Sequence, residues 1–158
     1  QEILDKLKRP TLRYTQATVE TAGEADCLII DCYGLLSSIY RYGTLAYIGG
    51  GFGVGIHNVP EAAVYGIPVI IGPNNKNFRE AQALLRQGGC LEISSAYDFN
   101  VIMQRITEDK AFLGEAGEKA GNYIKDNAGA VDKVFSKVNL ENFLFCGKDG
   151  LHTTTAKC

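Results

Sequence analysis

A cluster of glycines between two apolar segments is the feature that most constrains the fold of this chain. Five glycines fall within the seven residues 49–55, directly after the apolar residues 45–48. A short helical pattern and a second apolar segment, residues 68–71, follow. Glycine lets the backbone approach a ligand closely, and a helix start beside it favours an anion. The segment therefore predicts a site for a phosphate-bearing ligand at the carboxyl end of a parallel sheet.

Short apolar segments alternate with helical patterns along most of the chain. Predicted strands lie at residues 11–14, 25–31, 45–48, 68–71 and 90–93. Predicted helices lie at residues 2–8, 35–42, 59–65, 78–87, 97–107 and 111–138, with a break in the last near residues 127–129. Such alternation is typical of right-handed βαβ units. We therefore expect an α/β fold, a Rossmann-like parallel sheet flanked by helices, over residues 1–146, followed by a loose tail at residues 147–158.

The composition argues against several classes of partner. The net charge of −2 gives no electrostatic footprint for nucleic acid or a membrane surface. No apolar run reaches the roughly 18 residues that a bilayer span needs, and we expect no signal peptide in this segment. The five cysteines form no CxxC pair and are expected to be reduced thiols, with Cys27 and Cys90 in or beside apolar strands. The chain opens with Gln1 directly in a helical pattern, which suggests a soluble piece of a longer polypeptide.

Two common phosphate motifs do not fit the glycine cluster. The dinucleotide fingerprint G-x-G-x-x-G would need glycine where this chain has Val54 or Ile56. The P-loop also fails, because no Gly-Lys-Ser/Thr follows the glycines. NAD binding and ATP hydrolysis are therefore disfavoured, and a sugar nucleotide remains the common ligand of such a crevice.

The helix start after the glycines carries the candidate ligand-binding side chains. Asn58 occupies an N-cap position, with Pro60 at N1 or N2, where its missing N–H costs little. Glu61 either only complements the helix dipole or also accepts hydrogen bonds from ribose hydroxyls, and the spacing leaves both interpretations open. His57, on the preceding loop, is either structural or in contact with the ligand.

Other polar residues at predicted strand ends give weaker signals. A second glycine corner, at Gly34, would touch the same ligand if the strand before it neighbours the strand before the glycine cluster. Lys76, Arg79 and Glu80 fit a solvated helix start, with an anionic sugar as a weaker possibility. Asp31 has no histidine near it in sequence, and no nucleophile elbow, metal cluster or general-base pair is recognisable.

Residues 11–91 resemble the C-terminal half of the 3-deoxy-D-manno-octulosonic acid (Kdo) transferases, which are GT-B glycosyltransferases of bacterial lipopolysaccharide synthesis. The stretches that carry the resemblance are Tyr14-Thr15-Gln16, Ile30-Asp31-Cys32-Tyr33-Gly34-Leu35, Gly49-Gly50-Gly51-Phe52, His57-Asn58-Val59-Pro60-Glu61, Tyr65-Gly66-Ile67-Pro68-Val69, Gly72-Pro73 and Phe78-Arg79-Glu80-Ala81. The run His-Asn-x-x-Glu after the glycines, followed by Gly-x-Pro-Val-x-x-Gly-Pro, is specific.

The resemblance implies an inverting transfer of Kdo from CMP-Kdo to a lipid A precursor, at the cytoplasmic face of the inner membrane, without a metal or cofactor. In that family the C-terminal domain holds the CMP moiety. The general base and the acceptor surface lie on an N-terminal domain that this sequence does not include. We therefore expect no catalytic residue in this chain, and we expect the fragment alone to bind the donor without turning it over.

The donor-binding residues follow from the family motifs and from the glycine cluster. Carried over, the family's glycine corner becomes Tyr33, Gly34 and Leu35, and its helix start becomes Asn58, Val59, Pro60 and Glu61. The glycine cluster and its loop add Gly51, Gly53 and His57. The family's Pro-Arg pair has no counterpart here. Pro60 stands where the family usually has Leu, and Ala62 where it often has Pro, so a phosphate would have one amide fewer at the helix start.

Two other functions remain open at this stage. The first is a GT-B protein that uses a UDP- or GDP-sugar, such as a lipid-linked glycosyltransferase or a sugar-nucleotide epimerase. The second is a degenerate domain that keeps the fold and serves as a scaffold. Intact Asn58 and Glu61 argue against a scaffold, whereas Pro60 argues mildly for it.

Overall fold

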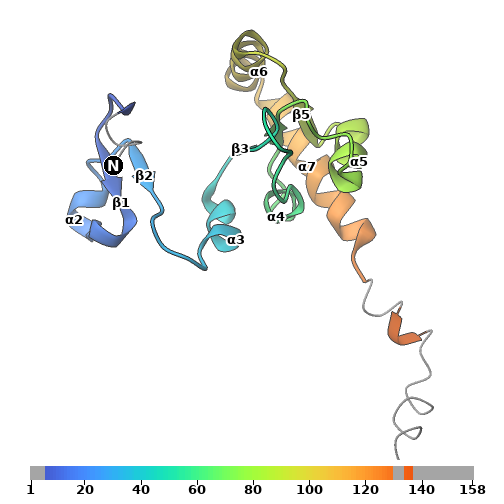
Figure 1. Cartoon of the computed structure of the whole chain (residues 1–158), viewed down its shortest axis with the longest axis horizontal. Coiled ribbons are helices and arrows are strands. Elements are labelled where there is room, and N and C mark those ends of the chain that lie inside the picture. Colours follow the sequence, from blue (N-terminus) through green and yellow to red (C-terminus); the bar gives the residue numbers. More distant parts are fainter. Residues whose placement is uncertain (1–5, 130–133, 137–158) are drawn as a thin grey trace, which may run out of the picture.

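The computed structural model describes residues 6–129 and 134–136, and it contains two parallel sheets (Figure 1). The first sheet pairs β1 (Thr11–Arg13) with β2 (Cys27–Ile29), and the second has the order β3 (Ala46–Ile48), β4 (Val69–Ile71) and β5 (Cys90–Glu92). The predicted mixture of parallel strands and flanking helices is confirmed. The predicted tail at residues 147–158 lies outside the described residues.

The helices follow the predicted alternation, with one addition. They are α2 (Val19–Ala22), α3 (Leu36–Ile39), α4 (Pro60–Ala63), α5 (Arg79–Gln87), α6 (Ala96–Glu108) and α7 (Lys110–Asn127), joined by the 3-10 turns η1 (Tyr14–Gln16) and η2 (Tyr40–Tyr42). The predicted break near Asn127 is confirmed, because α7 ends there. Helix α2 was not predicted from the sequence, although Thr18 and Thr21 form a capping box at its start.

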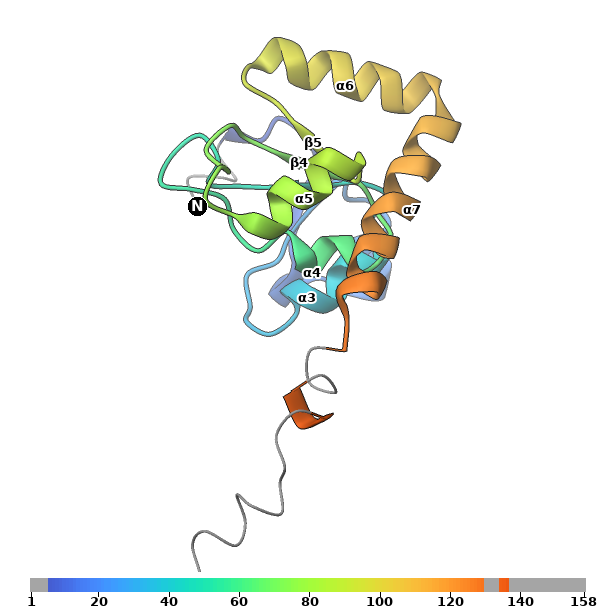
Figure 2. The ribbon, with the colours of Figure 1, turned by 90° about the vertical axis from the view of Figure 1, so that its right-hand side faces the viewer.

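The middle strand of the larger sheet is buried on both faces. Val69 and Ile71 point to one face and Ile70 to the other, and all three side chains are fully buried. Residues of α4, α5 and α7 pack on the first face, and residues of α6 and the start of α7 pack on the second (Figure 2). Burying each side chain contributes roughly 1.5–3 kcal/mol. This sheet with its helices α4–α7 is called the main core below.

Small residues let α7 lie directly against the turn between α4 and β4. A Cβ on Gly117 would collide with the carbonyl oxygen of Gly66, and one on Gly121 would come within 3.2 Å of the Gly66 Cα. Gly66 itself has φ 69°, a conformation that glycine adopts freely. Glycines weaken an isolated helix, but in α7 these two permit a close approach to the Gly66 backbone.

Cysteine placement agrees in part with the expectation of core thiols. Cys90, on β5, is buried, and burial raises the pKa of its thiol to about 12. A thiol with that pKa stays protonated and unreactive at neutral pH. Cys27, on β2, is only half-buried.

The N-terminal unit, residues 11–31, is separate from the main core. Its strands pair in parallel from Thr11↔Cys27 to Arg13↔Ile29, and Figure 1 shows the unit apart from β3–β5, with α3 between them. Strand β2 does not pair with β3, so the expectation of one continuous sheet was wrong. The intervening residues 32–45 form the glycine corner, α3 and η2, which carry the chain from one sheet to the other.

Candidate functional site

The glycine cluster folds into a closed loop after β3. The N–H groups of Gly53 and Gly55 donate to the Gly50 carbonyl at 2.9 and 3.1 Å, and the N–H of His57 donates to the Gly49 carbonyl at 3.2 Å. Gly50 has φ 88°, which the tight turn requires. These three amides are engaged within the loop and are therefore not free to donate to a phosphate.

Close backbone packing explains Gly51, one of the two cluster glycines that were assigned to ligand binding. A Cβ on Gly51 would lie 2.7 Å from the Gly72 Cα, so the loop rests directly on the loop that follows β4. Asn74 joins the same two loops, since its backbone N–H donates to the Gly51 carbonyl at 2.8 Å and its Nδ2 donates to the Gly53 carbonyl at 2.6 Å. Gly51 and Gly53 thus hold the site's shape rather than lining its hollow.

A buried amide fixes the loop after β4, and the sequence reasoning missed it. Asn75 is the one polar residue among the buried side chains of the described part of the chain. Its Nδ2 donates to the Gly72 carbonyl at 2.8 Å and to Glu92 Oε2 at 2.6 Å, and its Oδ1 accepts from Gln82 Nε2. This one side chain ties the loop to β5 and α5. Nothing in the sequence distinguishes Asn75 from an ordinary turn residue.

The segment after the glycines lines a hollow at the carboxyl end of the main-core sheet. The hollow has a volume of about 260 Å³. Its lining comprises Ile56, His57, Asn58, Val59, Pro60, Phe78, Glu80 and Ala81. His57 and Asn58 are exposed on it, whereas Val59 is packed into the core below. The structure therefore brings four of the predicted site residues to one open depression.

Asn58 and Glu61 interact with each other. Asn58 Nδ2 donates to Glu61 Oε1 at 2.7 Å, a charge-assisted bond that holds the carboxylate in place. The N-cap position belongs to Val59, which makes no side-chain cap bond, so the prediction that Asn58 caps the helix was wrong. Pro60 opens α4, as predicted. Glu61 is half-buried, and its Oε2 has no hydrogen-bond partner among the described residues.

Tyr40 lies near the Glu61 carboxylate. Burial of the Tyr40 ring raises the pKa of its hydroxyl, and the negative charge of Glu61 raises it further. The hydroxyl therefore remains protonated at neutral pH and can donate a hydrogen bond. The 3-10 turn η2, which carries Tyr40, packs against α4, which carries Glu61.

The second glycine corner does not reach this hollow. Tyr33 is fully exposed, and Gly34 turns the chain with φ 87°. Leu35 lines a different hollow, of about 510 Å³, with Tyr14 and Leu28 of the N-terminal unit among its neighbours. The proposed convergence of the two corners depended on β2 lying beside β3, and these strands belong to different sheets.

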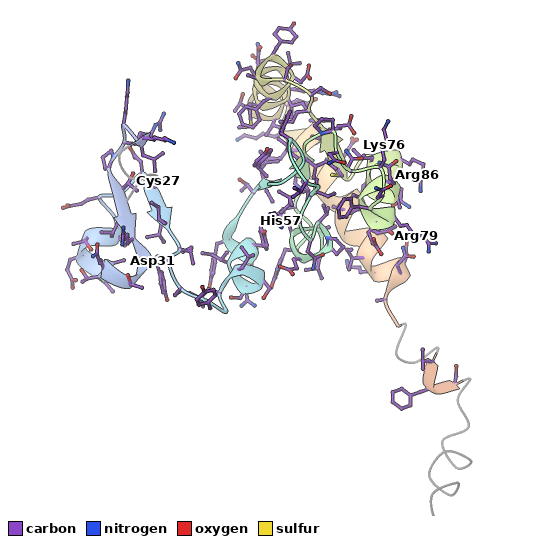
Figure 3. All side chains as sticks on the ribbon, viewed as in Figure 1. Cys27, Asp31, His57, Lys76, Arg79 and Arg86 are labelled. Atoms are coloured by element: carbon purple, nitrogen blue, oxygen red, sulfur yellow. The ribbon has the colours of Figure 1, made fainter. Side chains whose placement is uncertain are left out.

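Asp31 has a structural partner. Its two carboxylate oxygens accept from the backbone N–H of Thr15 at 3.0 Å and from the Thr15 hydroxyl at 2.8 Å. These hydrogen bonds, the hydroxyl first, hold the pKa of Asp31 below its usual range. Figure 3 places Asp31 in the N-terminal unit, away from His57.

Arg79 and Glu80 lie at the start of α5 and Lys76 precedes it. All three line a second groove toward α7, and Glu80 also lines the hollow at His57. No cluster of three metal-ligating side chains occurs among residues 6–129 and 134–136. Within those same residues, no helix combines the length and apolarity that a membrane crossing requires.

Sequence comparison finds relatives that share one name, 3-deoxy-D-manno-octulosonic acid transferase. The Haemophilus influenzae protein is 29% identical over 140 residues, which cover 84% of this chain and 32% of that protein. The Chlamydophila psittaci protein is 33% identical over 112 residues, 68% of this chain and 24% of that protein. The Rickettsia conorii protein is 28% identical over 116 residues, 72% of this chain and 25% of that protein. The chain thus spans about a quarter to a third of these relatives.

A solved structure shares the fold. The C-terminal CMP-Kdo binding domain of WaaA from Acinetobacter baumannii matches with a TM-score of 0.62 and 20% identity, over 78% of this chain and 65% of that chain. No protein-family model matches the chain. The resemblance to the C-terminal domain of the Kdo transferases is confirmed by the sequence relatives, and the fold class by the structural one.

Proposed function

We propose that this chain is the donor-binding domain of a Kdo transferase and holds CMP-Kdo in the hollow formed by His57–Pro60, beside Glu61. One observation carries the proposal: the segment that matches the family motif lines an open depression at the carboxyl end of a parallel sheet. Nucleotide ligands of α/β sheets bind at such edges. The similarity to Kdo transferases supports the choice of CMP-Kdo over other sugar nucleotides.

Glu61 has the central role in the proposed binding mode. Asn58 fixes one of its carboxylate oxygens, and the other is available for the hydroxyls of the ribose. His57 and Asn58 are exposed on the hollow and supply polar atoms for the phosphate ester. Tyr33, Gly34 and Leu35 enter the donor site only if the N-terminal unit moves toward β3, so their role stays a prediction.

The proposed reaction needs groups from the rest of the protein. A hydroxyl of the lipid A precursor attacks the anomeric carbon of Kdo, its proton passes to a general base, and CMP leaves with inversion. We place that base, the acceptor surface and the association with the inner membrane on the N-terminal domain. Two domains that close around a donor exclude water and orient it. The chain alone is therefore expected to bind CMP without transferring Kdo.

Calorimetric titration of the chain with CMP, UMP and GMP tests this function. We expect CMP to bind most tightly, and Glu61→Ala to weaken it by about 1–3 kcal/mol through loss of charged hydrogen bonds. Glu61→Gln keeps an acceptor for Asn58 but loses the charge, so its affinity for CMP should fall between those of the unmodified chain and Glu61→Ala. Glu118→Ala removes an exposed carboxylate of α7 outside the hollow and is the matched control.

Other outcomes of the titration point elsewhere. A preference for UMP or GMP would favour a GT-B protein that uses a UDP- or GDP-sugar. Equal and weak binding of all three nucleotides would favour a scaffold domain. Equal losses in the Glu61 and Glu118 variants would remove Glu61 from the site.

A further inference from the structure

A second and larger concave region lies between α5 and α7. Its volume is about 960 Å³, and its lining comprises Pro60, Lys76, Arg79, Glu80, Gln82, Ala83, Arg86, Tyr123, Ile124, Asn127 and Ala128. This α5–α7 groove shares only Pro60 and Glu80 with the hollow at His57. Figure 3 shows Lys76, Arg79 and Arg86 gathered on the side of α5, away from the N-terminal unit.

The groove is positively charged, whereas the chain as a whole is negatively charged. Lys76, Arg79 and Arg86 contribute three positive charges and Glu80 one negative charge, in a chain with a net charge of −2. None of the three cations has an ion pair or hydrogen bond among the described residues. A local excess of unpaired cations in a concave surface attracts anions.

The spacing of the arginines along α5 suits an extended anion. Arg79, Ala83 and Arg86 follow one face of the helix, at the i, i+4, i+7 spacing. Their Cα atoms span roughly 10 Å along the axis, at about 1.5 Å per residue. Between the two arginines lies the short side chain of Ala83. Tyr123 offers a hydroxyl from the opposite wall, where Asn127 Nδ2 donates to the Tyr123 carbonyl at 2.8 Å.

We propose that the α5–α7 groove binds a phosphate-bearing ligand through Lys76, Arg79 and Arg86, as a second site distinct from the donor hollow. A guanidinium group binds phosphate oxygens through two parallel N–H donors, which a lysine cannot reproduce. Arg79 and Arg86 each bind one anionic group of the ligand, and Lys76 adds positive charge at the mouth. The phosphate belongs either to a lipid headgroup or to a soluble compound.

Two probes test the site and distinguish the sources. Inorganic pyrophosphate is titrated into the chain by calorimetry at low ionic strength. Co-sedimentation with phosphatidylcholine vesicles, with and without phosphatidic acid, tests a lipid phosphate. We expect the double variant Arg79→Gln/Arg86→Gln to weaken binding to the favoured probe at least roughly tenfold, because two charged contacts are lost. Arg79→Lys/Arg86→Lys keeps the positive charges but loses the parallel N–H donors of the guanidinium groups, so the loss of affinity should be intermediate.

The control variant removes two positive charges from a part of the surface outside the groove. Lys110→Gln/Lys125→Gln changes two exposed lysines of α7 that lie outside the groove, and it should alter affinity less than about twofold. Binding of pyrophosphate alone would assign a soluble ligand, and selective sedimentation with phosphatidic acid a lipid. The proposal is overturned if neither probe binds, or if Lys110→Gln/Lys125→Gln weakens binding as much as Arg79→Gln/Arg86→Gln does.

A competition experiment separates this proposal from the donor site. Saturating CMP should leave pyrophosphate or vesicle binding unchanged, and Glu61→Ala should do the same. Displacement of the probe by CMP would overturn the second site, because the anion would then occupy the nucleotide hollow. Failure of CMP to bind would count against the proposed transferase function and leave the groove result standing.

Discussion

The main core and the N-terminal unit use the same local motif, parallel strands joined through helical turns, but they are stabilised differently. Every buried hydrophobic side chain among the described residues lies between Ala46 and Ala120. In the N-terminal unit, Val19 is 92% exposed and Leu28 is 45% exposed. Its order rests on the β1–β2 pairing and on exposed polar contacts such as Thr15 with Asp31. Burial, rather than local geometry, therefore separates a stable region from a marginal one.

Truncation of a leucine in each region gives the largest expected contrast. Leu84→Ala opens a cavity under α5, where the side chain is fully buried, and should lower the free energy of unfolding by about 3 kcal/mol. Leu28→Ala changes a half-exposed side chain on β2 and should cost less than about 1 kcal/mol. Urea denaturation followed by far-UV circular dichroism measures both. Similar losses in the two variants would contradict the contrast between the regions.

The buried amide of the main core gives the next largest effect. Asn75→Ala leaves Glu92 and Gln82 without their shared partner and should lower the free energy of unfolding by about 2 kcal/mol. Asn74→Ala is the matched control, because Asn74 is exposed and its side chain makes one hydrogen bond, to the Gly53 carbonyl. It should cost about 1 kcal/mol or less. If Asn74→Ala is the more damaging change, the buried network does not hold the loop.

The smallest effect is electrostatic and belongs to the N-terminal unit. Because the pKa of Asp31 is depressed in the folded state, its contribution is complete above the ordinary aspartate range and is lost as the pH falls through the folded pKa. An NMR titration should show the Thr15 amide resonance moving below about pH 4, while main-core amides stay unchanged. Thr15→Val should return the pKa of Asp31 toward its usual range. A transition shared by both regions would show that the unit is coupled to the core.

Much of the fold follows from sequence patterns, and the exceptions have physical causes. The apolar runs at β3, β4 and β5 and the helical periodicity of α5 and α6 come from local spacing. The separation of β1–β2 from the larger sheet was not predictable, because strand pairing depends on contacts between distant segments. The short helix α2 was missed because its signal is a threonine pair without an apolar stripe.

Sequence patterns indicated which segments would lie at the candidate site, but not the detailed contacts within it. The glycines and the motif that ends at Glu61 lie after β3, where part of that motif lines a hollow, and the use of this hollow as a binding site stays a prediction. Residue spacing does not encode three-dimensional geometry. It therefore could not show which backbone amides form hydrogen bonds within the loop, or that Asn58 donates to Glu61. Asn75 could not be identified, because its importance comes from complete burial between elements distant in sequence.

The glycine contact between α7 and Gly66 restricts how the helix can be seated. Sliding α7 by one turn would bring either Leu113 to the place of Gly117 or Lys125 to the place of Gly121. A Cβ at the first place would collide with the Gly66 carbonyl oxygen, and one at the second would lie 3.2 Å from the Gly66 Cα. A shift of α7 by one turn in either direction is therefore disfavoured. The seating of α7 also sets where Tyr123 lies relative to Arg79 and Arg86, so the small residues of α7 bear on the placement of one wall of the α5–α7 groove.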